Sequence, residues 1–289
     1  IVGLPGQSGF EFLVRGILGE DAKQVTIMSY ESLPWACRVL EFGTLAEVLG
    51  TKESMLGAML IGNPPPKMDA NDMMQKTMGK QPHLKVFGHL IGMTMMAPNS
   101  YIHPCLMYGQ WQSWDGKPLK EKPLFYHGVS EEGADTLVKV SQEIVDTAKA
   151  IMVKRPKVDL SSVITVHNWY KRCYSDDIGD TTSLYTCLRT NQAYNGLTHP
   201  CVQQDDATYL PDFTFRYMTE DVPCGIVVIR AVSTIAGVDT PNMDKVIMWA
   251  QVVMGKEYLI NGQLSGKDMP STRSPQAYGI TTLDGMLGL

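Results

Sequence analysis

Apolar residues recur at helical spacing through the later two-thirds of the chain. One stripe advances in steps of three or four residues and consists of Leu137, Val140, Ile144, Ala148 and Ile151. Lys139, Glu143, Asp146 and Lys149 lie off that stripe. Such spacing places the apolar side chains on one face of a helix. Thr240-Pro241 and Gly255 have the residue types that begin and end another helix. We expect further helices over 161–174, 182–194 and 224–236.

The first part of the chain mixes short strand patterns with helical ones. Residues 8–18 and 69–78 predict helices, whereas 1–5, 25–29, 39–42 and 46–49 predict strands. Three prolines at 64–66 interrupt any regular element. We therefore expect α/β structure over residues 1–95, in which the strands form a partial Rossmann-type sheet, followed by an all-α domain over 96–289. The hinge should lie near 95–98.

Charge, length and cysteine spacing exclude several classes of protein. The 289 residues carry a net charge of −5, which argues against nucleic-acid and anionic-membrane surfaces. The uncharged run 86–114 reads as buried, but glycines, prolines and amides interrupt it as a membrane span. Six cysteines include no Cys-x-x-Cys pair, so we expect free thiols, no metal site and no disulfide framework. With no signal peptide in view, we expect a soluble cytoplasmic protein.

Two polar segments carry the candidate chemistry. His103 lies inside the uncharged run, where its ring needs a hydrogen-bond partner. Arg216 and Asp221 precede Pro223, which is tolerated in the first turn of a helix, and the helix dipole there favours an ionised Asp221. Taken separately, these segments read as a core histidine and as a helix cap beside a surface arginine. Together they provide a proton donor, an orienting carboxylate and a carboxylate clamp, the parts of a hydroxy-acid-type dehydrogenase site.

Several longer motifs resemble those of invertebrate opine dehydrogenases of the octopine/tauropine type. They run over nearly the whole chain: Val2-Gly3-Leu4-Pro5, Glu31-Ser32-Leu33-Pro34-Trp35-Ala36-Cys37-Arg38, Tyr101-Ile102-His103-Pro104, Ser113-Trp114-Asp115-Gly116-Lys117-Pro118, Arg216 to Pro223, and Gly255-Lys256-Glu257-Tyr258-Leu259. The resemblance implies that residues 1–95 are the later part of an NAD-binding domain and 96–289 a substrate domain. It also implies a monomer that binds NAD, pyruvate and an amino acid.

The activity that the resemblance implies is the reversible, NADH-dependent condensation of pyruvate with an amino acid. His103 would supply the proton for the loss of water, and Asp221 would lie within hydrogen-bond reach of it and favour its charged form. Arg216 would bind the pyruvate carboxylate in a bidentate fork. Two alternatives remain open: direct reduction of a keto acid by a 2-hydroxy-acid dehydrogenase, and a catalytically silent nucleotide-sensing or interaction protein on this fold.

Four further residues within or near these motifs are candidates for binding the amino acid, and each also has a plainer reading. Trp169 is read equally well as a core aromatic residue of a helix. Glu31 and Ser32 are read almost as well as part of a strand-end turn. Cys37 is more simply a small buried side chain, because the sequence shows no base that would activate it. The sequence does not tell arginine, taurine, alanine, glycine and β-alanine apart as substrates.

The glycine-rich turn that holds a dinucleotide pyrophosphate is missing from this sequence. No Gly-x-Gly-x-x-Gly occurs, and the first residues already form a strand pattern. We therefore expect a fragment that enters partway through the nucleotide-binding domain, with its cofactor contacts unknown.

Overall fold

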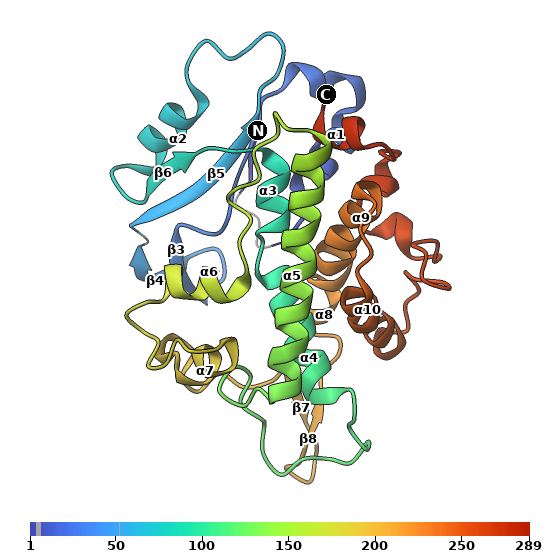
Figure 1. The fold of residues 1–289 in the computed structure, drawn as a ribbon. Helices are drawn as coiled ribbons and strands as arrows, with labels where there is room; N and C mark the ends of the chain where they lie inside the picture. The colour runs from blue at the N-terminus through green and yellow to red at the C-terminus, as the bar shows by residue number, and fades with distance from the viewer. Residues whose placement is uncertain (4–6, 52) are drawn as a thin grey trace.

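A computed structural model describes residues 1–3, 7–51 and 53–289, apart from the side chains of 36–38, 49 and 50. In Figure 1 the strands and α2 of the α/β part lie at the left and upper left with α1 at the top, and the helical part fills the centre, the right and the lower left. This order of the two parts agrees with the predicted fold class.

A four-stranded sheet forms the centre of the α/β part. Its strand order is β1-β2-β5-β6, with parallel outer pairs and an antiparallel pair β2–β5. The strands are β1 (Val2–Gly3), β2 (Ile27–Tyr30), β5 (Ser54–Leu60) and β6 (His83–Val86). The accompanying helices are α1 (Phe10–Leu18), α2 (Ala70–Met78) and a 3₁₀ segment (Gly19–Gln24). The predicted helices 8–18 and 69–78 and the strand 25–29 are thus confirmed to within a few residues. Within the strand predicted over 1–5, positions 4 and 5 lie outside the described residues.

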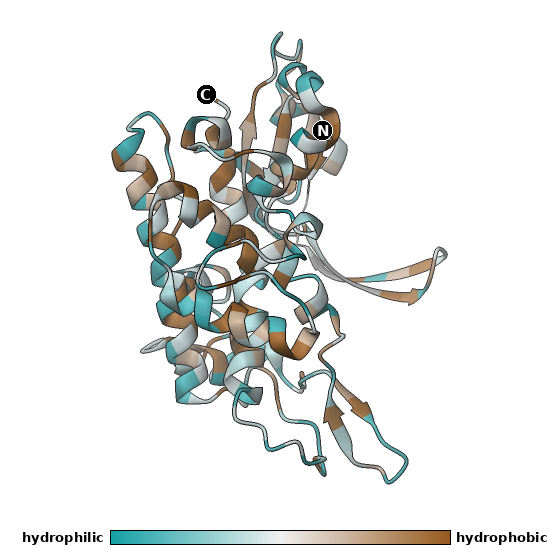
Figure 2. Ribbon diagram, turned by 90° about the vertical axis from the view of Figure 1, so that its right-hand side faces the viewer, coloured by the Kyte–Doolittle hydropathy of each residue, from teal (hydrophilic) through white to brown (hydrophobic). Residues whose placement is uncertain are grey.

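The predicted strands 39–42 and 46–49 exist, but the expectation that they join this sheet was wrong. They belong to a separate antiparallel hairpin of β3 (Trp35–Glu41) and β4 (Leu45–Thr51). Its tip carries apolar side chains into solvent, with Phe42 95% and Val39 69% exposed. Figure 2 shows this hairpin standing away from the rest of the molecule. The strand pattern predicted the extended backbone correctly, but it could not specify the pairing partner.

The helical part is built around α5, the long helix at the centre of Figure 1. Its helices are α3 (Leu90–Met95), α4 (Asn99–Trp111), α5 (Glu131–Lys154), α6 (Val166–Cys173), α7 (Leu184–Thr190), α8 (Arg216–Thr219), α9 (Val227–Ala236), α10 (Pro241–Met254) and α11 (Leu283–Leu287). Short 3₁₀ turns cover Gln192–Tyr194, Met269–Ser271 and Pro275–Tyr278. A hairpin of β7 (Cys201–Gln203) and β8 (Tyr209–Pro211), not predicted from the sequence, interrupts the helices.

The stripe predicted for α5 is buried throughout, from Leu137 to Ile151. Glu143, which lies off that stripe, is buried as well and is 8% exposed. Its carboxylate accepts hydrogen bonds from the backbone N–H groups of Asn242 and Met243, at 2.8 and 3.0 Å. Glu143 therefore caps the N-terminus of α10 in place of Thr240, whose side chain forms no cap bond.

The uncharged run 86–114 supplies α3 and α4, and most of its residues are buried, as predicted. The segment 95–98, where we expect the hinge, is also buried, and Met95 and Met96 share a core with Phe12 of the α/β part. No exposed linker therefore separates the two parts, and the division at 95/96 stays a prediction. Among the described residues, no helix combines the length and apolar character needed to cross a membrane.

Candidate active site

A π-helical turn positions Asp221. Helix α8 ends at Thr219, and Val222–Ile226 continues as a π turn that runs into α9. The wider turn is visible in the backbone, because Asp221 N–H donates to the Arg216 carbonyl and Ile226 N–H donates to the Asp221 carbonyl. Turns of this kind inside helices are frequent at functional sites. Asp221 stands at the N-cap position of this turn, as the plainer reading had it, but its side chain forms no cap bond.

Close packing of this turn against α4 brings Asp221 to His103. A Cβ atom on Gly225 would lie 2.8 Å from the Cα atom of Ser100 and 2.9 Å from its carbonyl oxygen. Only glycine permits this approach, because any side chain at 225 would push the turn away from α4. His103 lies one turn after Ser100 on α4 and is 4% exposed.

His103 and Asp221 form a buried hydrogen-bonded pair, which confirms the predicted contact. The Nδ1 atom of His103 lies 2.8 Å from Oδ2 of Asp221. On the other side of the ring, Nε2 lies 3.1 Å from the hydroxyl of Tyr126. The ring of Tyr217 stacks on the imidazole with centroids 3.8 Å apart, and Phe125 meets it edge-on at 5.7 Å. Both ring nitrogens and one ring face of His103 are thus engaged.

Burial raises the pKa of Asp221, while the hydrogen bond and charge of His103 and then the charge of Arg216 act in the opposite direction. Arg216 begins α8, and its side chain is exposed. No described residue forms a hydrogen bond or ion pair with its guanidinium. Arg216 is therefore a cation beside the pair that is available to an anionic ligand.

The structure places the other predicted site residues less directly. Trp169 is 8% exposed on α6 and packs edge-on against Tyr170 and Tyr174, an arrangement that fits a core aromatic residue. The Glu31 carboxylate pairs with Arg172 of α6, which ties the end of β2 to the helical part. Ser32 follows Glu31 and is half-buried. The side chain of Cys37 lies outside the described residues. The roles of all these residues stay predictions.

Sequence reasoning missed Tyr126 and Phe125. Both lie in the irregular segment between α4 and α5, where no periodicity marks a buried position, yet they are 6% and 1% exposed. Tyr217 stands within the Arg216 motif but was assigned no role. No local sequence signal distinguishes Tyr126 from the other tyrosines, because its contact with His103 depends on how the loop returns to α4.

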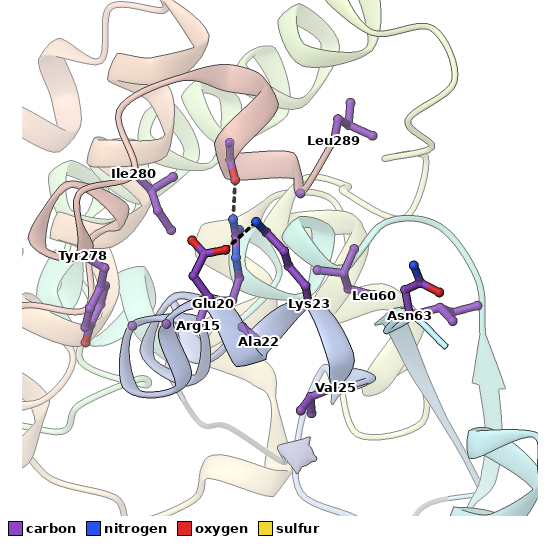
Figure 3. A pocket seen from close by; sticks show the side chains of 15 residues that line it. Arg15, Glu20, Ala22, Lys23, Val25, Leu60, Asn63, Tyr278, Ile280 and Leu289 are labelled. Carbon is purple, nitrogen blue, oxygen red and sulfur yellow. Dashed lines mark hydrogen bonds and ion pairs between the residues drawn. The ribbon is translucent and has the colours of Figure 1, made fainter. Parts of the chain in front are cut away.

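One cavity lies beside the pair, and another lies elsewhere on the molecule. One of about 320 Å³ adjoins the pair, since Tyr217 lines it together with Lys122, His199 and Asp212. The other, of about 650 Å³, lies between α1, its 3₁₀ extension and the C-terminal residues, where Figure 3 shows Arg15, Lys23 and Tyr278. Arg15 donates to the backbone carbonyls of Gly285 and Met286, and Lys23 pairs with Glu20. None of the residues lining this second cavity belongs to the predicted site.

The chain resembles known proteins over almost its whole length. It is 52% identical to tauropine dehydrogenase of Arabella iricolor, covering 99% of this chain and 72% of the relative. It is 48% identical to octopine dehydrogenase of Pecten maximus, covering 99% and 71%. A solved structure of octopine dehydrogenase with NADH and L-arginine superposes with a TM-score of 0.94 at 46% identity, covering 99% of this chain and 70% of that one. Yersinopine dehydrogenase, at 11% identity and a TM-score of 0.62, shares the fold.

The fold, an α/β part followed by a helical part, is shared with the dehydrogenases above, and the chain is an NAD-dependent oxidoreductase. Residues 86–254 match the model of the NAD/NADP octopine/nopaline dehydrogenase α-helical domain, and the chain belongs to that family.

The α/β part has one feature typical of nucleotide-binding domains and lacks another. The sheet has parallel strand pairs of the kind that nucleotide-binding domains use. However, the sequence contains no Gly-x-Gly-x-x-Gly turn, so the described residues supply no pyrophosphate cradle of that type. The contacts to NAD stay unassigned in this chain.

Proposed function

We propose that the protein catalyses the reversible, NADH-dependent condensation of pyruvate with an amino acid to give an opine. The observation that carries the proposal is the buried His103–Asp221 pair, joined at 2.8 Å beside the exposed cation of Arg216. Relatives named tauropine, opine and octopine dehydrogenase support it. Structures similar to this chain contain NADH with L-arginine in one case and NADH with pyruvate in another.

In the proposed mechanism, His103 acts as the general acid of the condensation. The amine adds to the keto carbon, and the resulting hydroxyl group must leave as water, which requires a proton. Asp221 accepts the Nδ1–H hydrogen bond and favours the charged imidazolium. NADH, when bound, supplies the hydride that reduces the imine carbon. In the reverse direction His103 starts neutral and accepts a proton.

Arg216 is the proposed clamp for the pyruvate carboxylate. Its guanidinium is exposed, close enough to Asp221 to affect that carboxylate, and bound to no described side chain. A planar fork would fix both the charge and the orientation of a keto acid.

The amino acid is proposed to lie near Glu31, Ser32, Cys37 and Trp169. Glu31 and Trp169 are supported by their place where the end of β2 meets α6, at the junction of the two parts. Because Arg172 already occupies the Glu31 carboxylate, an amine that binds there must share or replace that ion pair. The monomeric state and the cytoplasmic location stay predictions from the sequence.

The test is an assay of the full-length protein with NADH and pyruvate, alone and with arginine, taurine, alanine, glycine or β-alanine. We expect NADH oxidation to depend on one of the amines and to yield the corresponding N-(carboxyethyl) product, identified by mass spectrometry. An equal rate with pyruvate alone, yielding lactate, would instead identify a 2-hydroxy-acid dehydrogenase.

A further inference from the structure

The hydroxyl of Tyr126 occupies the place from which a substrate would exchange a proton with His103. Nδ1 of the imidazole is bound to Asp221, so only Nε2 remains for proton transfer. The Tyr126 hydroxyl lies 3.1 Å from Nε2, and the His103 ring is stacked under Tyr217. In this arrangement a reacting oxygen reaches His103 either by displacing the phenol or through it.

Packing holds the Tyr126 ring in place. Tyr194 stacks on it with centroids 3.9 Å apart and planes 16° from parallel. Phe125 meets it edge-on at 4.9 Å, and only 6% of Tyr126 is exposed. Displacing the hydroxyl would therefore require breaking two favourable aromatic contacts. Proton transfer through the phenol requires no such movement.

The hydrogen bonds available to Tyr126 depend on the protonation of His103. When the imidazole is neutral with its proton on Nδ1, Nε2 accepts from the Tyr126 O–H. When the imidazole is charged, Nε2–H donates to the phenol oxygen and the phenol O–H turns to a third atom. Within the described chain, no residue other than His103 forms a hydrogen bond with this hydroxyl. Burial also raises the pKa of Tyr126 well above its usual value, which keeps it a phenol.

We propose that Tyr126 is a further catalytic residue that passes the proton of His103 to the oxygen leaving as water. As the carbon–oxygen bond of the carbinolamine breaks, the Tyr126 O–H proton moves to the leaving oxygen. The Nε2 proton of His103 moves to the phenol oxygen at the same time. Water, an iminium ion, a neutral phenol and a neutral imidazole result, and the reverse reaction retraces these steps. The inference rests on the proposed function of the His103–Asp221 pair.

The first test replaces Tyr126 by phenylalanine in the full-length protein, which removes the hydroxyl and keeps the ring stacked on Tyr194. We expect the single-turnover rate of condensation to fall roughly 10²–10⁴-fold, the usual contribution of a general acid, with the KM for pyruvate nearly unchanged. Tyr108→Phe is the matched control. It removes a phenol that is also buried on the helical part, at 4% exposure, and that donates only to Gln112. Its rate should equal that of the wild type.

Three outcomes separate this inference from the proposed function. Full activity of Tyr126→Phe together with an inactive His103→Ala would overturn the relay and leave the His–Asp pair standing. Full activity of His103→Ala would overturn the pair itself. A higher KM for pyruvate with an unchanged rate in Tyr126→Phe would reduce Tyr126 to a binding role and overturn the relay.

A measurement on the unmodified enzyme keeps the inference testable if the variant fails to fold. Two protons move together in the relay, so the single-turnover rate in mixtures of H₂O and D₂O should follow a curved, quadratic dependence on the deuterium fraction. A linear dependence indicates one proton in flight, directly from His103, and would overturn the relay.

Discussion

Two carboxylates, Asp221 of the helical part and Glu11 of the α/β part, are buried to the same degree but have different hydrogen-bond partners. Each is 3% exposed, and each has one oxygen without a hydrogen-bond partner among the described residues. The other oxygen of Asp221 meets the imidazole of His103 at 2.8 Å, whereas that of Glu11 accepts from the hydroxyl of Thr94 at 2.7 Å. The two sites differ in whether a basic side chain is buried against the carboxylate.

The cation nearest to Glu11 on its own helix binds other groups. Arg15 lies one turn further along α1, but its guanidinium donates to the carbonyls of Gly285 and Met286. Burial raises the pKa of Glu11 to about 7, and the Thr94 hydrogen bond and the charge of Arg15 offset only part of that rise. A buried charge is expensive unless it is paired. The comparison therefore indicates that Glu11 takes up a proton near neutral pH, while His103 and Arg216 support the charge that Asp221 needs.

The largest effect should come from Asp221→Asn, which removes the charge and keeps the shape. An asparagine amide can donate to Nδ1 and so stabilise the wrong tautomer of His103. We expect the condensation rate to fall roughly 10²–10⁴-fold, the range of general acid catalysis. Because the condensation needs a protonated His103, the loss of its rate at high pH should begin at lower pH than in the wild type. An unchanged pH profile in stopped-flow assays would show that Asp221 does not support the imidazolium.

The matched change in the other region, Glu11→Gln, should alter stability and leave the pH profile of catalysis alone. The pKa of Glu11 rises from 4.5 to about 7 on folding, so the folded state holds a proton that the unfolded state releases. The contribution of Glu11 to the free energy of unfolding is therefore fully present below about pH 4.5 and falls as pH rises toward 7. Above that pH the free energy of unfolding is lower by about 3 kcal/mol.

Denaturant unfolding at pH 4.5, 6 and 8 measures this slope. Glu11→Gln should reduce it, while Glu47→Gln, at an exposed position of the β3–β4 hairpin, should retain it. An unchanged slope in Glu11→Gln would mean that Glu11 is not the group that titrates.

Arg216→Lys tests the second cation of the Asp221 region. Lysine keeps the charge and loses the bidentate fork, which removes a charged hydrogen bond worth about 1.5–3 kcal/mol. The KM for pyruvate should therefore rise about 10–100-fold, and that for the amino acid much less. Initial-rate kinetics with each substrate varied in turn provide the measurement. Equal rises in both KM values would assign Arg216 to holding the structure together.

Sequence patterns predicted some helices correctly and missed some strands. Helical spacing identified α5 because a buried stripe at one period leaves a local trace, and the residue types at its two ends identified α10. Strand β5, with the sequence Ser54-Met55-Leu56-Gly57-Ala58-Met59-Leu60, was missed because it lacks the alternation of a half-buried strand. Its neighbour β6 is a short strand of four residues that was also missed. The β3–β4 hairpin pairs residues close in sequence, from Glu41 with Leu45 to Trp35 with Thr51, and the strand pattern does not show that it stays apart from the four-stranded sheet.

The candidate site was likewise predicted from the sequence only in part. His103 and Asp221 were predicted together from unusual motifs and a family resemblance, and the structure joins them. Their joining requires Gly225 to lie against Ser100, which no periodicity encodes. Tyr126 and Glu11 were missed because a loop tyrosine and an acid in the first turn of a helix are both ordinary features of exposed sequence. Only the folded chain shows that each is buried.

The smallest expected effect concerns Glu143. This third buried carboxylate has neither the imidazole partner of Asp221 nor the single hydroxyl donor of Glu11. Burial raises its pKa, and hydrogen bonds from Asn242 and Met243 lower it without any cation. Glu143→Gln retains one oxygen acceptor and loses the other, so one N–H of the first turn of α10 is left without its partner. We expect a loss of about 1–2 kcal/mol in denaturant unfolding. Asp146→Asn, an exposed change on the same helix, should stay within about 0.5 kcal/mol of the wild type. If Glu143→Gln is as stable as that control, the start of α10 does not depend on this carboxylate, and helix N–H groups are not an alternative to a cation for holding a buried acid in this fold.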